Sequence, residues 1–217
     1  MNKIADSYDR KFQYLRLSIT EACNFSCSYC LPNGYQKTCG EQYLSEKEII
    51  HLLNAFCELG ISKVRLTGGE PTVRADVVSL VSKIAQLQGI KKIAITTNGY
   101  CLQKIALPLK QAGLTNLNLS MDSLDENNFN KITGRNLFRN IIAGLEESIK
   151  VGIPTVKINT VLLKDLNHHE LPDFIEFVRN KPISLRFIEL MQTGNNYDYF
   201  RKHHLSTDII HAHLRSH

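Results

Sequence analysis

The sequence contains no apolar run long enough to cross a bilayer, and it does not begin with the apolar stretch of a secretion signal. Its first ten residues, MNKIADSYDR, contain two aspartates and are only weakly apolar. These absences argue against a membrane protein and against an exported one. We therefore expect a soluble, cytoplasmic protein with no membrane partner.

The sequence also lacks a basic cluster. Its net charge is +5 and its pI is about 8.8, but lysines and arginines are scattered along the chain. Binding to nucleic acid is therefore not expected. A modest positive field still favours an anionic small molecule, such as a nucleotide, at a cleft.

A disulfide framework is not expected either, because cysteines in a cytoplasmic chain are more often metal ligands or buried small side chains. Three of the six cysteines crowd together, at Cys23, Cys27 and Cys30. The others stand alone, at Cys39, Cys57 and Cys101. We assign those three no role, and the apolar surroundings of Cys57 indicate a core position.

Short β-rich runs alternate with stretches of helical periodicity. Six runs are predicted strands, at 14–20, 63–67, 91–97, 116–121, 155–162 and 183–190. Three intervening helices have clear boundaries, at 45–59, 74–87 and 136–150. Ser45 and Glu48 form the capping-box signature of a helix start. The alternation predicts one α/β domain over 1–217, with a parallel sheet and right-handed crossovers.

The strands have one polar face and one apolar face. In the first strand Arg16 and Ser18 share a face, while Leu15 and Leu17 share the other, as a period of two requires. The second, fourth and fifth strands repeat this pattern. If helices cover the apolar faces, the polar faces converge on a hydrated or ligand-filled interior. We therefore predict a partial (βα)6 TIM-like barrel, with a flat sheet as the alternative.

The three crowded cysteines come directly after the first strand, where barrel enzymes keep their catalytic loops. Three thiolates can hold three irons of a cubane cluster and leave the fourth iron open to an external ligand. A structural zinc site needs a fourth protein ligand, which Cys39 could supply. Zinc therefore stays open as an alternative on spacing alone.

The pattern CxxxCxxC, with the aromatic Tyr29 before its last cysteine, resembles the signature of the radical S-adenosylmethionine (SAM) superfamily. The run LTGGEP at 66–71 resembles the glycine-rich element that lies along the methionine part of SAM. Gly68 and Gly69 have no Cβ atoms to prevent close backbone approach, and strand-end amides can bond a carboxylate or amine.

Further segments resemble one family within that superfamily, the GTP 3',8-cyclases of molybdenum cofactor biosynthesis. These segments lie at 14–20, 63–71, 96–100, 120–124, 157–161, 167–169 and 185–191. The resemblance implies a GTP-binding lyase with one [4Fe-4S] cluster and SAM as cofactors. It implies that a 5'-deoxyadenosyl radical takes the C3' hydrogen of GTP, after which C3' joins C8 to give 3',8-cyclo-7,8-dihydro-GTP.

The resemblance also implies roles for individual residues. The cluster ligands are Cys23, Cys27 and Cys30. The residues that line SAM are Tyr29, Gly69, Ser120 and Met191. The residues that contact GTP are Arg16, Arg65, Thr96 and Lys157, with Arg16 and Lys157 also among the catalytic residues. The strand faces independently place Arg16, Arg65, Ser120 and Lys157 in the interior. The alternative is that these polar groups only form ion pairs with Glu70, Asp122 or Glu189.

The chain departs from the family at its C-terminal side, because no cysteine follows Cys101 and the family's second-cluster region is expected to be absent. Three hypotheses follow: the N-terminal part of a GTP 3',8-cyclase, a shorter radical SAM protein acting on another small substrate, or a non-catalytic remnant. The superfamily suggests an electron donor of flavodoxin type, and the chain is expected to be a monomer or homodimer.

Two histidine pairs invite a metal interpretation that we do not favour. His168 and His169 are expected to begin a helix, because adjacent helical residues point in different directions. The segment at 201–204 is expected to be a solvated polar stretch.

Overall fold

The computed structural model describes residues 4–37, 43–193 and 196–215. Six strands form one sheet in the order β1-β2-β3-β4-β5-β6, and each neighbouring pair is parallel. The strands are β1 (Tyr14–Ser18), β2 (Lys63–Thr67), β3 (Lys92–Thr97), β4 (Asn116–Ser120), β5 (Thr155–Leu162) and β6 (Ile183–Glu189). All six predicted strands are confirmed.

Helices separate the strands along the chain. They are α1 (Glu46–Glu58), α2 (Val77–Ala85), α3 (Leu102–Gln111), α4 (Glu126–Thr133), α5 (Phe138–Lys150), α6 (Leu171–Arg179), α7 (Tyr197–His203) and α8 (Asp208–Arg215), with short 3-10 helices η1 (Pro71–Val73) and η2 (His168–Glu170). Within the described ranges, no helix has the length and apolar character needed to cross a membrane.

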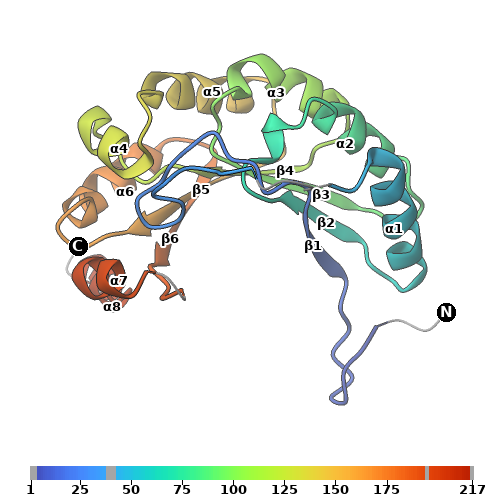
Figure 1. Ribbon diagram of the computed structural model, residues 1–217, viewed down its shortest axis with the longest axis horizontal. Coiled ribbons are helices and arrows are strands. Elements are labelled where there is room, and N and C mark those ends of the chain that lie inside the picture. The colour runs from blue at the N-terminus through green and yellow to red at the C-terminus, as the bar shows by residue number, and fades with distance from the viewer. Residues whose placement is uncertain (1–3, 38–42, 194–195, 216–217) are drawn as a thin grey trace.

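The sheet is curved. Helices α1 to α5 arch along its convex side, and α7 and α8 lie beside β6 at the opposite end from β1 (Figure 1). Because β1 and β6 are the two edges of the sheet, the barrel is not closed. The predicted partial barrel is therefore confirmed, and the flat-sheet alternative is wrong.

The apolar core lies between the sheet and the outer helices. Val64 and Leu66 of β2 are fully enclosed, as are Leu117 and Leu119 of β4. Burying a side chain of this size stabilises a fold by about 1.5–3 kcal/mol. Since side chains alternate along a strand, this burial commits the intervening polar residues to the concave side.

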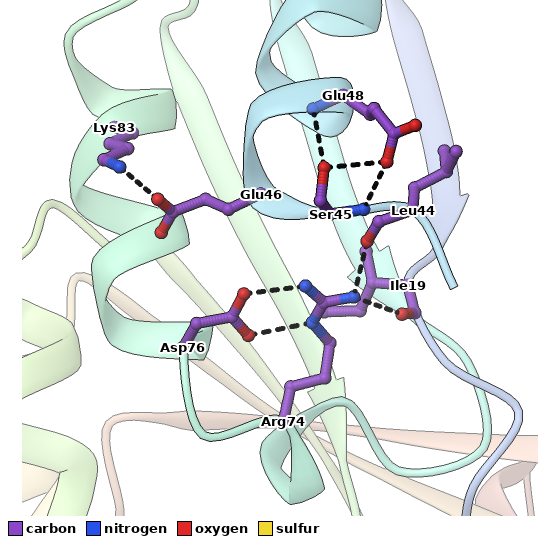
Figure 2. Close-up of polar contacts among 8 residues, drawn as sticks. All are labelled: Ile19, Leu44, Ser45, Glu46, Glu48, Arg74, Asp76 and Lys83. Carbon is purple, nitrogen blue, oxygen red and sulfur yellow. Dashed lines mark hydrogen bonds and ion pairs between the residues drawn. The ribbon is translucent and has the colours of Figure 1, made fainter. Parts of the chain in front are cut away.

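The boundaries of α1 and α2 show which local signals decide helix starts. Ser45 accepts a hydrogen bond from the Glu48 amide, and the Glu48 carboxylate accepts one from the Ser45 amide, so the predicted capping box is confirmed (Figure 2). In contrast, α2 begins at Val77 and not at Arg74. Arg74 is extended, because η1 comes before it and its side chain is bound elsewhere.

Arg74 joins three separate parts of the chain (Figure 2). Its Nη1 donates to the carbonyl of Ile19 at 3.0 Å and to that of Leu44 at 2.9 Å. Its Nε and Nη2 donate to the Asp76 carboxylate at 2.9 and 2.7 Å. The bonds from Arg74 hold the pKa of Asp76 below its usual value. One guanidinium thus ties the end of β1 to the starts of α1 and α2.

Replacing Arg74 by alanine leaves the Ile19 and Leu44 carbonyls without their charged donor. We expect Arg74→Ala to lower the free energy of unfolding by about 2–4 kcal/mol, measured by urea unfolding with circular dichroism. Lys83→Ala is the control, because Lys83 forms a half-exposed ion pair with Glu46 whose loss costs less than about 1 kcal/mol. Equal losses of unfolding free energy in the two variants would contradict the role of Arg74 in joining β1, α1 and α2.

Candidate functional site

Three cysteines lie in the loop that follows β1, which we call the cysteine loop (residues 23–30). Cys23 and Cys27 are half-buried, and Cys30 is exposed. All three line one cavity of about 340 Å³ together with Gly68 and Gly69. The sequence-predicted cysteine and glycine motifs therefore meet, because the carboxyl ends of parallel strands share an edge of the sheet.

The cysteine loop is hydrogen-bonded to the end of α4. The amides of Ser26 and Ser28 donate to the carbonyls of Thr133 and Ile132, at 3.1 and 2.8 Å. Gly134, in the left-handed conformation (φ +68°), ends the helix beside Ser26. The backbone of the loop is thus held in place by the last turn of α4.

Asn24 provides a second attachment for the loop. Its carbonyl accepts a hydrogen bond from Arg135 Nε at 2.7 Å, and its side-chain oxygen accepts one from Asn98 Nδ2 at 2.8 Å. Asn98 directly follows β3. The loop is therefore connected to β3 as well as to α4.

The two glycines of the GGEP turn serve the fold itself. A Cβ on Gly68 would lie 2.1 Å from the carbonyl oxygen of Thr20, and one on Gly69 would lie 2.3 Å from that of Ala22. The amides of Gly69 and Glu70 donate to these same oxygens, each at 2.8 Å. The expectation that strand-end amides are available to a ligand is therefore wrong for these two. Among described residues, nothing donates to the Gly68 or Gly69 carbonyls, which suits an ammonium group.

The donor chemistry of the cysteine loop fits an iron–sulfur cluster. In the described part of the chain, no three His, Cys, Asp or Glu side chains are placed to hold a single metal ion. A cubane gives each thiolate its own iron, so its ligands need not converge on one point. Three thiols around one cavity match that requirement. The zinc alternative depends on Cys39, which lies outside the described residues.

Each thiol of the loop has a raised pKa. Burial is the main cause for Cys23, Cys27 and Cys30, and the negative charge of Asp122 adds to it at Cys27 and Cys30. The metal-free loop therefore favours protonated thiols. Metal ligation must displace those protons, because the thiolate is the ligand form.

A second cavity of about 240 Å³ adjoins the loop on the side of β5 and β6. Tyr29 and Met191, both expected to line SAM, border it together with Cys30 and Val161. Met191 is 72% exposed, whereas the Tyr29 hydroxyl bonds to Asp122 at 2.7 Å. Cys30 lines both cavities, so both lie beside the loop.

The remaining predicted site residues lie on the concave face of the sheet. In register, Arg16 of β1 is opposite Arg65 of β2, and Lys157 of β5 is opposite Asn118 of β4, whose other partner is Thr96 of β3. Register partners in a parallel sheet share a face. These residues therefore lie on one face of the sheet, as the strand periodicity predicted.

Ser120 lies one step nearer the cysteine loop. It is opposite Asn159 of β5, which is in turn opposite Arg186 of β6. Arg65 Nε, Thr96 Oγ1 and Asn159 Oδ1 are buried polar atoms that find no hydrogen-bond partner among the described residues. Such atoms are costly, so they are expected to gain partners from a ligand.

The ion-pair alternative for the concave-face cations is wrong. Within the described ranges, Arg16, Arg65 and Lys157 make no ion pair. The three carboxylates proposed as partners bind other groups. Glu70 accepts from Thr72, Thr97 and Asn98, Asp122 accepts from Tyr29 and Val161, and Glu189 accepts from His204 and Thr207.

Sequence reasoning missed two further cations of this face. Lys63 and Arg186 follow the same strand periodicity as Arg65 and Asn159. The pKa of Lys63 is lowered by desolvation and by repulsion from neighbouring cations, Arg65, Lys157 and Arg186 among them. The period of two within β2 and β6 would have been enough to include both.

The interpretation of segment 201–204 as solvated is wrong at its end. His203 is buried, and its Nδ1 lies 2.9 Å from the Lys164 carbonyl oxygen, while His204 Nε2 lies 2.8 Å from Glu189. The pair His168-His169 forms η2 directly before α6, as expected.

Comparison with known families gives one match of wide coverage. The model of the radical SAM superfamily matches residues 17–178. The chain is 51% identical over 212 residues to the GTP 3',8-cyclase of Psychromonas ingrahamii, covering 98% of this chain and 62% of that protein. It is 51% identical over 208 residues to that of Synechococcus elongatus, covering 95% and 64%. The chain thus spans less than two thirds of the length of these relatives.

Solved structures share the fold. Streptococcus suis SuiB bound to S-adenosylmethionine has a TM-score of 0.76 at 20% identity, covering 94% of this chain and 46% of that one. HydG, a maturase of the [FeFe]-hydrogenase, has a TM-score of 0.69 at 14% identity, covering 90% and 46%. These similarities concern architecture alone.

Adding a methyl group at Gly69 should separate the GGEP turn from the backbone of Glu21 and Ala22. We expect Gly69→Ala to lower the free energy of unfolding by about 2–4 kcal/mol, because its Cβ meets backbone that cannot rotate away. Gly152→Ala is the control: Gly152 has φ +73° and no atom within 4 Å of an added Cβ, so only a backbone cost of about 1–2 kcal/mol applies. Chemical unfolding measures the free energy of unfolding of both variants. A smaller decrease in Gly69→Ala than in Gly152→Ala would refute the packing explanation.

Proposed function

This chain belongs to the radical SAM superfamily, and from that premise we propose that Cys23, Cys27 and Cys30 hold a [4Fe-4S] cluster whose fourth iron binds SAM. The observation that carries the proposal is the single cavity that the three thiols share with Gly68 and Gly69. When bound, the cluster and SAM supply an electron and a 5'-deoxyadenosyl radical for hydrogen abstraction. The chain's own residues bind, orient and shield the reactants.

The two cavities beside the cysteine loop provide the SAM site in this proposal. The carbonyls of Gly68 and Gly69 accept from the ammonium group of the methionine part. Tyr29 and Met191 border the more apolar cavity and exclude water from the adenosine part. Ser120, at the end of β4, offers a hydroxyl on the concave face between the loop and the substrate.

The substrate in this proposal is GTP, and the reaction is its 3',8-cyclisation in molybdenum cofactor biosynthesis. The names of the two relatives support this assignment. The concave face supports it independently, since Arg16, Arg65 and Lys157 have no counter-ions among the residues that the structure describes, and guanidinium and ammonium groups suit triphosphate oxygens. Thr96 Oγ1 and Arg65 Nε are two of the buried atoms that lack a hydrogen-bond partner within 4–37, 43–193 and 196–215.

In this arrangement the protein works by placement. The phosphates are held over β1, β2 and β5, so that the nucleoside extends toward Ser120 and the cysteine loop. Fixing one ribose hydrogen near the SAM site converts a bimolecular encounter into a directed step. The predicted flavodoxin-type reductant, and the choice between monomer and homodimer, remain part of the proposal.

Loss of one loop thiol should abolish cluster binding. After anaerobic reconstitution with iron and sulfide, we expect about four irons per wild-type chain and release of 5'-deoxyadenosine from SAM upon dithionite reduction. Cys27→Ser should lose both. Cys57→Ser is the control, because Cys57 belongs to α1 and not to the loop. A folded wild-type chain without iron, or equal loss in both variants, would rule out the cluster assignment.

Removing a concave-face cation should weaken nucleotide binding. We expect Lys157→Ala to lower the affinity for GTP by tenfold or more, because a charge-assisted contact to phosphate is lost. Lys150→Ala should leave the affinity unchanged, because Lys150 is exposed on α5 and paired with Glu147. Calorimetric titration at two salt concentrations measures both variants. The same affinity in wild type and Lys157→Ala would contradict the assignment of GTP to this face.

A further inference from the structure

Asp122 is a buried carboxylate that none of the assignments above uses. It lies just after β4 and is 4% exposed. Its Oδ2 accepts a hydrogen bond from the Tyr29 hydroxyl at 2.7 Å, and its Oδ1 accepts one from the Val161 amide at 2.9 Å. In the described part of the chain no cation pairs with it. A carboxylate held only by neutral donors keeps its negative charge uncompensated.

Tyr29 connects this carboxylate to the cysteine loop. It lies between Cys27 and Cys30 in sequence, and burial strongly raises the pKa of its phenol. The bond from Tyr29 to Asp122 joins positions far apart in the chain, the loop after β1 and the end of β4. The backbone amides of Ser26 and Ser28 attach the loop to α4, whereas the Tyr29–Asp122 bond attaches it through a side chain to the end of β4.

The charge of Asp122 reaches the loop thiols. Burial raises the pKa of Asp122 to about 6, against the opposing bonds from Val161 and Tyr29, so the group is ionised at pH 7.5 or above. Asp122 bonds to Tyr29, which directly precedes Cys30 in the chain, so its charge lies beside the loop that carries the thiols. An electron entering a cluster held by this loop would meet that negative charge.

We propose that Asp122 is a positioning residue for the cysteine loop. Asp122 holds Tyr29 against the end of β4, and its fixed negative charge beside the loop lowers the reduction potential of the cluster. The part that concerns the potential rests on the proposed cluster. A fixed negative charge in a poorly solvated site destabilises the reduced, more negative state of the cluster. A lower potential makes the cluster a stronger reductant toward the bound sulfonium of SAM.

The positioning part is tested without any cluster. We compare amide hydrogen exchange of residues 26–31 in the metal-free chain between wild type, Tyr29→Phe and Tyr100→Phe. Tyr29→Phe removes the hydroxyl bond and should accelerate exchange in that segment by about tenfold or more. Tyr100→Phe removes a hydroxyl that bonds to the Thr72 carbonyl and should leave the segment unchanged. Unchanged exchange in Tyr29→Phe overturns the positioning role.

The electrostatic part is tested on reconstituted chains by spectroelectrochemical titration. Asp122→Asn removes the charge while keeping an oxygen for the Val161 amide, and it should give a more positive midpoint potential than wild type. Glu170→Gln is the matched control, because Glu170 is an equally enclosed carboxylate whose donors come from Ser123, Leu124 and Asn128. It should leave the potential unchanged.

The outcomes separate this inference from the proposed function. An unshifted potential in Asp122→Asn, or an equal shift in Glu170→Gln, overturns the electrostatic role even when every chain carries iron. A wild-type chain that takes up no iron overturns the proposed function and, with it, the electrostatic role. The exchange experiment then still decides whether Asp122 positions the loop.

Discussion

The arrangement of the site depends on the contact between the chain at 20–22 and the turn after β2. Two hydrogen bonds, from the amides of Gly69 and Glu70, hold these backbones so closely that a Cβ on Gly68 or Gly69 would overlap a carbonyl oxygen. This contact aligns the ends of β1 and β2, and it sets one wall of the cavity that the three thiols share. Arg74 extends the same constraint outward, since it binds the carbonyl of Ile19 just before the contact.

The enclosed carboxylates and the basic side chains of the concave face do not pair with one another within the described residues. The enclosed carboxylates Glu70, Asp122 and Glu170 are satisfied by hydroxyl groups and backbone or side-chain amides. Because they take no cations as partners within the described residues, the basic side chains of the concave face are left without internal counter-ions. Hydroxyl and amide donors thus take the place of ion pairs at the enclosed carboxylates, and the positive charge of the basic side chains stays on the concave face.

Strand periodicity was enough to predict the parallel sheet, its order of elements and the face on which Arg16, Arg65 and Lys157 lie. Those features follow from the period of two and from burial of the alternate residues. The start of α2 could not be read in the same way, because the tertiary bonds of Arg74 override its local helix preference. The burial of His203 was missed for a similar reason, since it depends on the distant Lys164 carbonyl. The glycine motif was recognised in the sequence, but the motif alone could not show that Gly68 and Gly69 pack against the carbonyl oxygens of Thr20 and Ala22.

The repulsion that Lys63 experiences from neighbouring cations has a consequence for handling the protein. A ligand-free chain holds like charges together in a partly desolvated space, and any multivalent anion relieves that stress. We therefore expect phosphate, sulfate or citrate in a buffer to bind at this face and to stabilise the folded chain. A melting temperature measured in such a solution would then describe the anion complex, and a buffer of monovalent salts would report the stability of the ligand-free chain.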